Sequence, residues 1–458
     1  MTRGFLPYSS QTRPDFTYIF IFTAKVYLEI ATQKWTTMSS TSTQDLQEHP
    51  LYDGEQQTQQ AAPLNPRCIA STSETSNSRI AHDTPASASR THGKYNHSFF
   101  KEAQLSADGS TIVSHNDDRS LRTFVLPENL EDENKQPHTL TPTTTLPSPT
   151  NIQSYALYPG FTQSDPTTNL VLSAPTDLPI RLTNLTNPTS PLMTYPFIHP
   201  PTEAYQSPHS LAWSPFNNHF IAGSKGSLAI FDANVDASGP IATHNNSPRN
   251  PSTAISSMRD SGLIMSLAIS GGGALAAGSS NRRIGIFSTC GQGPCETAFS
   301  VAPARDDPLA PICKGTGVTS LAWSPDGTYL LAAERQSDGI HVFDVRCQRR
   351  RLAWLSGRNA LTPQRLGIST VQVMSGVEVW AGGKDGAVRM WRNPGTGEGV
   401  RGPDGVFEGL HGDPVGSVVW GPGGREMVTC SGQRRVGGND SDDEEDGGGD
   451  SSLKVWRV

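Results

Sequence analysis

Short runs in which apolar and polar residues alternate recur along the chain, and each leads into a turn. Alternation of this kind predicts β-strands, because successive side chains of a strand point to opposite faces. The clearest runs begin at Ser210 and Ser320, both reading Ser-Leu-Ala-Trp-Ser-Pro. Related runs lie at a spacing of 48 to 56 residues and begin at Glu102, Ser154, Ser266, Ser369 and Ser417. This period is typical of a β-propeller with loop insertions, since an undecorated blade takes about 40–45 residues.

A later run in each repeat ends on an aromatic or bulky apolar residue. We interpret these ends as degenerate copies of the Trp-Asp pair that closes the third strand of a WD repeat. They include Phe231-Asp232, Phe343-Asp344, Trp391-Arg392 and Trp456-Arg457. The prediction is therefore an all-β, seven-bladed WD-repeat β-propeller. His411, Asp385 and Trp391 are the best candidates for the polar network that WD repeats carry.

The chain ends directly after the third strand of the last repeat, so another segment must complete that blade. We expect residues 93–98 to supply the missing strand, which removes an open sheet edge. The propeller is therefore assigned to residues 93–458. Residues 1–92 are expected to form a disordered tail, because residues 36–92 are rich in Ser, Thr, Gln, Pro and Ala. Met38 is an alternative start, which would make residues 1–37 artefactual.

The apolar stretch of residues 16–24 is not expected to anchor the chain in a membrane. Lys25 and Glu29 interrupt it well before the roughly 20 apolar residues that a membrane-spanning helix needs. The six cysteines are spread along the chain and indicate a reducing compartment. Cys290 and Cys295 form a close pair, but nearby residues supply no further ligands, so we expect no zinc or other metal site.

The formal net charge of −7 arises from one short window. Residues 437–452 hold seven acidic residues and no basic residue, so the rest of the chain is neutral overall. This acidic loop either docks a basic protein or is simply solvated. Only local basic patches can therefore indicate nucleic acid.

Motifs of catalysis are missing from the repeats. The sequence has no phosphate-binding glycine loop, no Ser/His/Asp or Cys/His constellation and no pair of histidines at metal-ligand spacing. Gly271-Gly-Gly is followed by neither a Lys-Ser/Thr pair nor a helix, and is interpreted as a turn. We expect a protein that is not an enzyme and that takes no cofactor and no small-molecule substrate.

Basic residues concentrate where the fifth repeat meets the sixth. Six arginines lie within twenty residues that contain no acid, namely Arg346, Arg349, Arg350, Arg351, Arg358 and Arg365. Such a patch could neutralise RNA phosphates, with Trp354 or His341 stacking on bases if exposed. The alternative is that these arginines are solvated and that Trp354 packs in the core. Further candidates near turns between second and third strands are Arg119, Lys225, Arg282, Arg283 and Lys384.

The order of these segments resembles the telomerase Cajal-body WD-repeat protein family, including its fungal members linked to pre-mRNA splicing. The resemblance covers about residues 95–458. It rests on Leu178-Pro-Ile-Arg-Leu, on Val342-Phe-Asp-Val-Arg followed by Pro363-Gln-Arg-Leu, and on Thr429-Cys-Ser-Gly-Gln-Arg-Arg with the acidic insertion after it. It makes Gln364, Arg365, Gln433 and Arg434 the first candidates for RNA contact.

This resemblance implies a scaffold of nuclear small ribonucleoproteins. Its partners would be H/ACA-type small RNA or telomerase RNA and the proteins of these particles. The expected location is the nucleus, in the Cajal body or its equivalent, with the cytoplasm as a second compartment. The alternative is an adaptor that binds only proteins, for instance in pre-mRNA splicing or a ubiquitin ligase.

Overall fold

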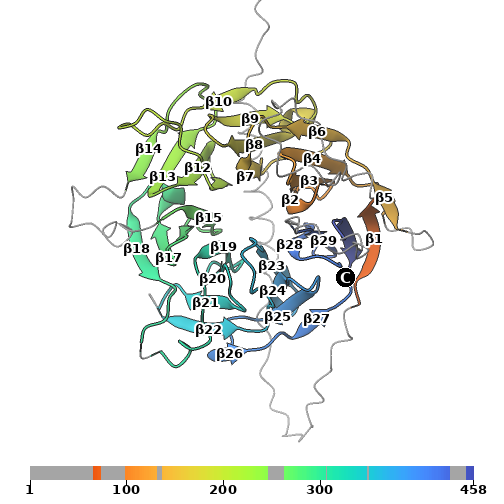
Figure 1. Ribbon diagram of the computed structural model, residues 1–458, viewed down its shortest axis with the longest axis vertical. Coiled ribbons are helices and arrows are strands. Elements are labelled where there is room, and N and C mark those ends of the chain that lie inside the picture. The colour runs from red at the N-terminus through yellow and green to blue at the C-terminus, as the bar shows by residue number, and fades with distance from the viewer. Residues whose placement is uncertain are drawn as a thin grey trace, which may run out of the picture. The chain divides into compact units, whose positions relative to one another are not determined.

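The computed structural model describes residues 65–73, 98–130, 137–245, 262–305, 307–347, 350–433 and 450–458. Every strand named below belongs to the larger of two compact units, which comprises Ala62–Pro215 and His219–Val458. In this unit seven sheets, built mainly from antiparallel strand pairs, surround a central axis (Figure 1). The predicted seven-bladed, all-β propeller is confirmed. Two short 3-10 helices, η2 (Pro166–Thr168) and η4 (Thr289–Gly291), are added to the strands.

The first four blades each contain four strands, named from the inside outward. Blade one contains β2 (Phe100–Leu105), β3 (Thr111–Asn116), β4 (Ser120–Val125) and β6 (Thr144–Pro147). Blade two contains β7 (Ile152–Leu157), β8 (Leu170–Pro175), β9 (Ile180–Asn184) and β10 (Met193–Tyr195). Blade three contains β11 (Ser210–Trp213), β12 (His219–Ser224), β13 (Ser227–Asp232) and β14 (Ala242–Asn245). Blade four contains β15 (Ile264–Ile269), β16 (Leu275–Ser279), β17 (Arg283–Phe287) and β18 (Cys295–Ser300).

Two of the remaining three blades carry a fifth strand. Blade five contains β19 (Val318–Trp323), β20 (Tyr329–Glu334), β21 (Ile340–Asp344), β22 (Arg351–Leu355) and then β26 (Gly399–Arg401). Blade six contains β23 (Ile368–Val373), β24 (Gly376–Gly382), β25 (Val388–Arg392) and β27 (Gly405–Phe407). Blade seven contains β28 (Val415–Trp420), β29 (Glu426–Ser431), β30 (Leu453–Arg457), β1 (Arg67–Thr72) and then β5 (His138–Leu140).

The residues that mark the start of each repeat in the sequence all lie in innermost strands. In five of these strands the pairing register shifts immediately before the marker residue, which is Glu102, Ser154, Ser266, Ser320 or Ser417. A β-bulge bends a strand and redirects a side chain. The repeated bulge therefore explains why one position recurs in the sequence.

The marker serines join each blade to the next. Ser154 Oγ donates a hydrogen bond to the carbonyl of Pro208 at 2.9 Å, at the entrance to blade three. Ser417 Oγ accepts one from the amide of Ala103 at 3.0 Å, across the junction of blades seven and one. Equivalent bonds link Ser210 to Ile264, Ser266 to Leu321 and Ser320 to Ile368. Ser369 is the exception, since its buried hydroxyl has no partner among the described residues.

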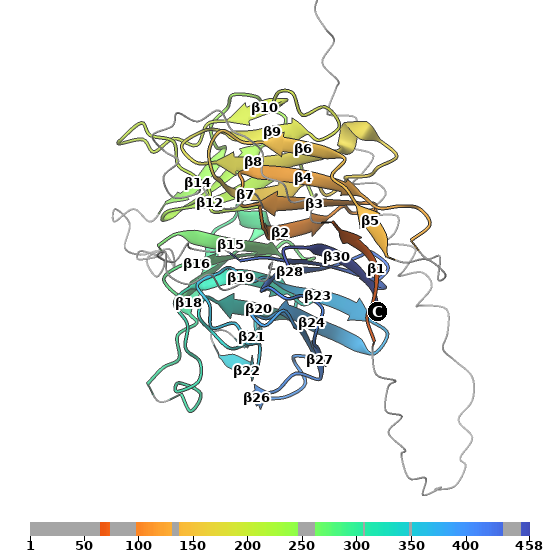
Figure 2. The same ribbon diagram turned by 45° about the vertical axis from the view of Figure 1, so that its right-hand side comes forward.

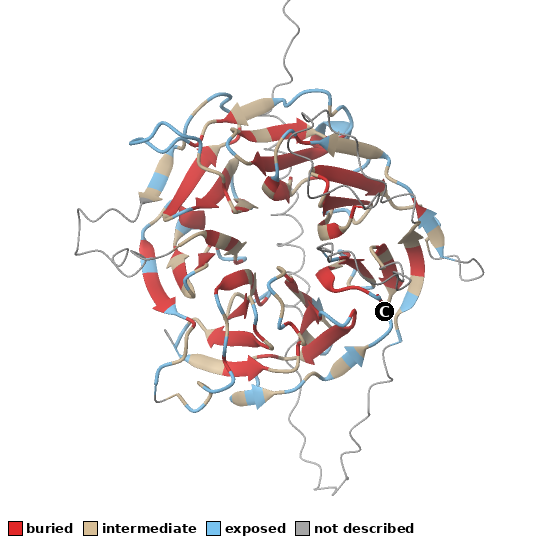
Figure 3. Ribbon diagram, viewed as in Figure 1, coloured by how far each residue is buried: buried red, intermediate tan, exposed pale blue. Residues whose placement is uncertain are grey.

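Apolar side chains of neighbouring sheets form the core between blades. Ile284 and Ala276 of blade four pack with Val318 and Leu330 of blade five, and all four are fully buried. Figure 3 shows the buried residues concentrated in the inner strands of each sheet, with exposed residues along the outer strands. Burying one such large aliphatic side chain contributes about 1.5–3 kcal/mol.

The closing strand is not the one predicted. The strand next to β30 is β1, which pairs antiparallel with it, including Arg67 with Arg457 and Ser71 with Lys454. The prediction of residues 93–98 as the donor was wrong, as was a disordered tail across residues 67–72. The Ser- and Thr-rich composition of the surrounding stretch hid a short strand whose Ile69 and Ala70 are buried. Residues 1–64 and 74–97 lie outside the described residues, so the rest of the predicted tail stays a prediction.

Two connections reach back over the edge of the preceding blade. β5, from the connection between β4 and β6, pairs parallel with β1. β26, from the connection between β25 and β27, pairs parallel with β22. Figures 1 and 2 both show β5 outside β1 and β26 outside β22. β1 is therefore held on both sides, and two strand edges are covered.

The polar network typical of a WD repeat is present in blade seven, with different members from those predicted. His411 Nε2 and Thr429 Oγ1 share a hydrogen bond of 2.7 Å, and Trp456 Nε1 donates to the same oxygen at 2.7 Å. The other ring nitrogen of His411 lies 3.5 Å from Asp450 Oδ2. The grouping of His411 with Trp391 was wrong, because the indole nitrogen of Trp391 has no partner among the described residues.

Candidate nucleic-acid interface

One face of the propeller carries two kinds of connection. The first kind is the turn between the second and third strands of a blade, and the second is the loop that leads into the innermost strand of the next blade. We call this side of the propeller the turn face. The two kinds touch repeatedly. The amide of Lys384 donates to the carbonyl of Asn359 at 2.8 Å, and Lys225 forms a β-bridge with Leu263. All predicted positions at turns between second and third strands therefore lie on one face.

The two motifs that the resemblance marked for RNA contact meet on the turn face. Gln364, in the loop between β22 and β23, donates from Nε2 to the carbonyl of Gly432 at 2.7 Å. Gln433 is exposed and donates to Asp413 at 3.3 Å. Arg434 and most of the acidic loop, residues 434–449, lie outside the described residues. Segments almost 70 residues apart in the sequence are thus joined at the boundary of blades six and seven.

Arg365 directly follows Gln364 in this loop. Its side chain is half-buried and makes no hydrogen bond or ion pair with any residue that the structure describes. Burial lowers the pKa of His115, in blade one, and of His209, before blade three, and the charge of Arg365 lowers both further. Its charge thus acts on residues in blade one and in the loop before blade three, although Arg365 itself lies in the loop that leads into blade six.

The arginine run at the junction of blades five and six does not form one patch. Arg358 is fully buried, and its guanidinium donates to the carbonyls of Leu366 and Gly367 at 2.8 and 3.3 Å. Burial lowers its pKa to about 10. Arg351 is almost as buried and pairs with Asp307 at 3.0 Å. Both were predicted as RNA contacts, and both instead stabilise loops inside the fold.

Three further members of the run lie on the opposite face or outside the described residues. Arg346 is exposed and pairs with Asp344 at 2.7 Å in the turn that follows β21. Arg350 pairs with Glu398 at 3.1 Å, and both side chains are exposed. Arg349 lies outside the described residues. Arginines that are close together in the sequence therefore do not lie on one surface, because the chain reverses direction between them.

The stacking side chains suggested from the sequence are also internal. Trp354 is 2% exposed and His341 is fully buried, with their rings 4.7 Å apart. Neither can stack on a base without unfolding its blade. Trp354 packs in the core, as the alternative interpretation predicted, but Arg351 and Arg358 are not solvated as the same interpretation required.

The candidates at the turns differ in how free their side chains are. Lys225 and Lys384 are exposed, and neither side chain makes a hydrogen bond or ion pair with another described residue. Arg119 donates to the carbonyl of Pro149 at 3.1 Å. Arg283 begins β17 and is half-buried. Arg282 belongs to an ion-pair cluster with Glu334, so its charge is not free to bind a phosphate as those of Lys225 and Lys384 are.

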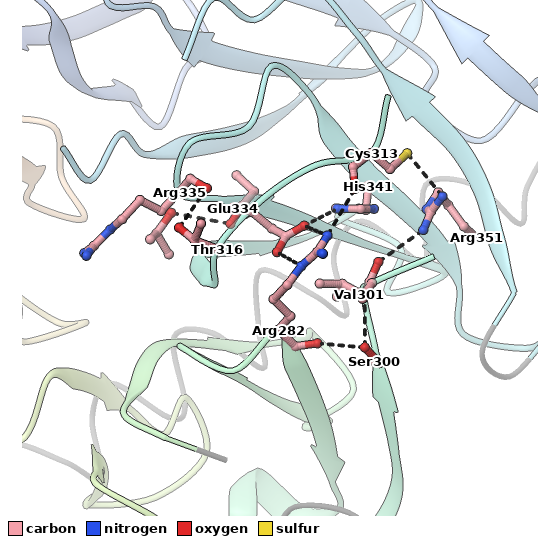
Figure 4. Close-up of polar contacts among 12 residues, drawn as sticks. Arg282, Ser300, Val301, Cys313, Thr316, Glu334, Arg335, His341 and Arg351 are labelled. Carbon is pink, nitrogen blue, oxygen red and sulfur yellow. Dashed lines mark hydrogen bonds and ion pairs between the residues drawn. The ribbon is translucent and has the colours of Figure 1, made fainter. Parts of the chain in front are cut away.

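Figure 4 shows this cluster at the junction of blades four and five. Arg282 makes two hydrogen bonds to the carboxylate of Glu334, at 2.7 and 2.8 Å, and His341 approaches the same carboxylate at 2.9 Å. Glu334 is fully buried, which works to raise its pKa, but the hydrogen bonds from His341 and Arg282 hold that pKa below the ordinary value. The cluster joins two blades.

Two basic residues of the turn face were missed. Arg335 directly follows β20, and in Figure 4 its guanidinium points away from the ion-pair cluster. Lys314 is exposed in the loop before β19. Neither side chain forms a hydrogen bond or ion pair with the rest of the described chain. Arg335 could have been found, because it holds the same place after the second strand as Lys225 does in blade three.

Three acidic residues at the turns are neutralised from within their own blades. Three turns carry an aspartate four residues before a basic residue of the third strand, and each pair forms an ion pair. The pairs are Asp118 with Arg122, Asp385 with Arg389 at 2.6 Å, and Asp450 with Lys454 at 2.9 Å. These carboxylates are therefore engaged, while Lys225, Arg335 and Lys384 carry charge without a partner in the described part of the chain.

The described residues show neither a metal-ligand cluster nor a membrane-spanning helix. They contain no group of three or more His, Cys, Asp or Glu residues placed to hold a metal ion. None of the helices described has the length and hydrophobicity of a membrane-crossing helix. Cys290 and Cys295 are both buried, and burial raises the pKa of Cys295 to about 11.

Comparison with known proteins identifies the family. The WD domain, G-beta repeat model matches residues 310–344. Guanine nucleotide-binding protein negative regulator 1 of Schizosaccharomyces pombe is 30% identical over 298 residues, which cover 64% of this chain and 71% of that protein. Human Telomerase Cajal body protein 1 is 25% identical over 343 residues, or 73% of this chain and 57% of that protein. The chain belongs to this WD-repeat family.

A third member of the WD-repeat family extends the comparison to budding yeasts. Protein SWT21 of Vanderwaltozyma polyspora is 28% identical over 248 residues, or 53% of this chain and 55% of that protein. The chain thus spans little more than half the length of the human and Vanderwaltozyma relatives. The residues that match the repeat model comprise β19, β20 and β21 with the loop before them, which is the part of blade five that holds Lys314 and Arg335.

Proposed function

We propose that the protein is a non-enzymatic scaffold that binds a small nuclear RNA across its turn face. The observation that carries this proposal is the bond between Gln364 and Gly432, which places the Gln364-Arg365 motif against the residue that precedes Gln433. Basic side chains without a described partner extend the surface on the same face through blades three, five and six. They are Lys225, Lys314, Arg335 and Lys384.

The chemistry of these side chains suits RNA. Lysine and arginine neutralise phosphates and release counterions, while a glutamine amide can read the edge of an unstacked base. Asp118, Asp385 and Asp450 already pair with strand cations, and the free cations have no ion pair with a described residue that would have to break before they bind phosphate. Each phosphate contact to single-stranded RNA should contribute about 0.7 to the slope of log affinity against log salt.

The kind of RNA is inferred from the relatives. Several are named Telomerase Cajal body protein 1, which associates those proteins with telomerase and with a nuclear compartment. We therefore expect H/ACA-type small RNA or telomerase RNA as ligand, and the nucleus as the location. Proteins of the same particles would bind elsewhere on the propeller.

The test is ultraviolet crosslinking and immunoprecipitation of the tagged protein in cells, with sequencing of the bound RNA. The variant Arg335→Gln/Arg365→Gln removes two free cations of the turn face. Arg346→Gln is the matched control, since it removes an exposed arginine from the opposite face. We expect enriched H/ACA-type or telomerase RNA that falls in the double variant only. No RNA above background, or equal loss in both variants, would refute direct binding by this face.

A second candidate is an adaptor that binds proteins without RNA. Two observations favour it: exposed Ile198 and Tyr205 pair in a β-bridge on the turn face, and Leu361 is exposed there as well. The fission yeast relative is named as a negative regulator of a guanine nucleotide-binding protein, which indicates a protein target. Affinity purification with and without ribonuclease separates the candidates. Partners that persist after ribonuclease, together with no crosslinked RNA, would support the adaptor.

A further inference from the structure

A small pocket lies between blades one and two, away from the Gln364–Gly432 junction. Its volume is about 180 Å³. One wall is the end of β6 with the loop that follows it, and the other comes from β8, β9 and residues 188–191. Four prolines line it, namely Pro147, Pro175, Pro188 and Pro191, and Arg181 is the one charged residue among the lining residues.

Arg181 lacks the partner that the repeat pattern provides elsewhere. Asp177 precedes it by four residues, the same spacing as in the Asp385–Arg389 pair. The strand register is also the same, since Arg181 pairs with Ser173 just as Arg389 pairs with Ala381, eight residues earlier in both blades. Yet the guanidinium of Arg181 makes no hydrogen bond or ion pair with any described residue.

Pro179 explains the difference. In blade six the residue after the aspartate, Gly386, takes the left-handed conformation with a φ of 78°. In blade two the corresponding residue, Leu178, precedes a proline, which disfavours helical backbone conformations there. The left-handed residue is instead Asp177, with a φ of 56°. The shift changes the direction of the Asp177 side chain, and Arg181 is left without its carboxylate.

A buried hydroxyl supplies a second unsatisfied group in the same pocket. Ser148 is 8% exposed, and its Oγ has no hydrogen-bond partner among the described residues. A buried polar group without a partner is destabilising. A ligand that accepts hydrogen bonds from both Arg181 and Ser148 would remove this penalty.

We infer that this pocket binds a carboxylate, namely an Asp or Glu side chain of a protein partner. One guanidinium balances one negative charge and binds a carboxylate through two parallel hydrogen bonds. A phosphate monoester carries nearly two charges and is usually held by several basic residues, which this pocket lacks. The proline rings give an apolar wall for the methylene groups of the acidic side chain. The site lies on the turn face between blades one and two, but it shares no residue with the proposed RNA surface and does not depend on RNA binding.

The test measures binding of propionate, which mimics a glutamate side chain, by ligand-observed nuclear magnetic resonance on the full-length protein. Propionamide is the neutral control and methyl phosphate is the dianionic one. We expect saturable binding of propionate that exceeds binding of both controls. Equal binding of propionate and propionamide, or tighter binding of methyl phosphate, would overturn the assignment of a carboxylate site.

Three variants locate the binding. Arg181→Gln should lower the affinity for propionate roughly tenfold or more, as expected for the loss of a charge-assisted pair of hydrogen bonds. Arg346→Gln, on an exposed arginine elsewhere, should leave the affinity unchanged. Pro179→Ala removes no lining residue but permits the turn of blade six, so Asp177 can pair with Arg181 and compete with the ligand. We expect it to weaken binding as well. Unchanged binding in Arg181→Gln, or in a correctly folded Pro179→Ala protein, would contradict the proposal.

Discussion

Replacing Arg282 by methionine should destabilise the junction of blades four and five. The substitution keeps an unbranched side chain but removes both hydrogen bonds to the fully buried carboxylate of Glu334. Removing one partner of a buried ion pair costs about 3–5 kcal/mol, because the other charge stays buried. We use the lower figure, about 3 kcal/mol, since Arg282 is 24% exposed and His341 remains as a donor.

Thermal unfolding provides the assay for this junction. For a propeller that spans residues 67–458, the unfolding entropy per residue gives slightly more than about 1 °C for each kcal/mol, so we expect the Tm to fall by about 4 °C. The exposed pair of Arg346 with Asp344 is the matched control, and Arg346→Met should shift the Tm by less than about 1 °C. A Tm for Arg282→Met that stays as close to the wild type as that of the control would refute the reasoning.

The pH dependence of the same variant gives an independent check. Arg282 helps to hold the pKa of Glu334 below its ordinary value, so the pair stabilises the fold above the pKa of an unfolded glutamate. This stabilisation is lost as the pH falls through the folded-state pKa. The difference between wild type and Arg282→Met should therefore shrink as the pH is lowered from about 4.3, the pKa of an unfolded glutamate, towards about 2. A constant difference would mean that the ion pair is not its cause.

Three further predictions concern closure, blade contacts and buried histidines. Removal of residues 1–73 deletes β1 and should lower the free energy of unfolding by at least about 3 kcal/mol, the cost of losing the buried Ile69 side chain alone. A chain that starts at Met38 keeps β1 and should match the full-length protein in thermal unfolding. Ser417→Ala should cost about 1 kcal/mol in urea denaturation and Ser369→Ala almost nothing, because only Ser417 of the two has a hydrogen-bond partner among the described residues. The free energy of unfolding should fall from about pH 7 to about pH 5, because burial lowers the pKa of His115, His341 and His411, whereas the unfolded chain protonates them below about pH 6.5. A Tm that stays constant over that range would contradict this prediction.

The sequence was sufficient to predict the blades, because strand alternation and the repeated Ser-containing run are local signals. It could not reveal why the run recurs, since the marker serines bond to other blades, and the partner of Ser417 is Ala103, 314 residues earlier in the chain. The closing strand was missed for a related reason. Six strand residues in a Ser- and Thr-rich stretch carry almost no local signal, and β1 is defined by its partners β30 and β5.

The candidate site was predictable only where the signal was a motif or a position in the repeat. Gln364 and Lys384 lie on the turn face as their positions in the repeat required. Arg351 and Arg358 do not, because their burial depends on Asp307 and on carbonyl groups that the fold brings to them. A count of charges along the sequence contains no information about such partners.

The proposed function requires that RNA contacts the turn face and no other surface of the propeller. The most direct measurement is mass spectrometry of peptides that carry a crosslinked nucleotide after ultraviolet irradiation of cells and purification of the protein. We predict crosslinks within residues 356–367 and in the neighbouring turns that hold Arg335 and Lys384. Crosslinks confined to the opposite face, such as the turn at residues 324–328, or none at all, would contradict RNA binding by the turn face.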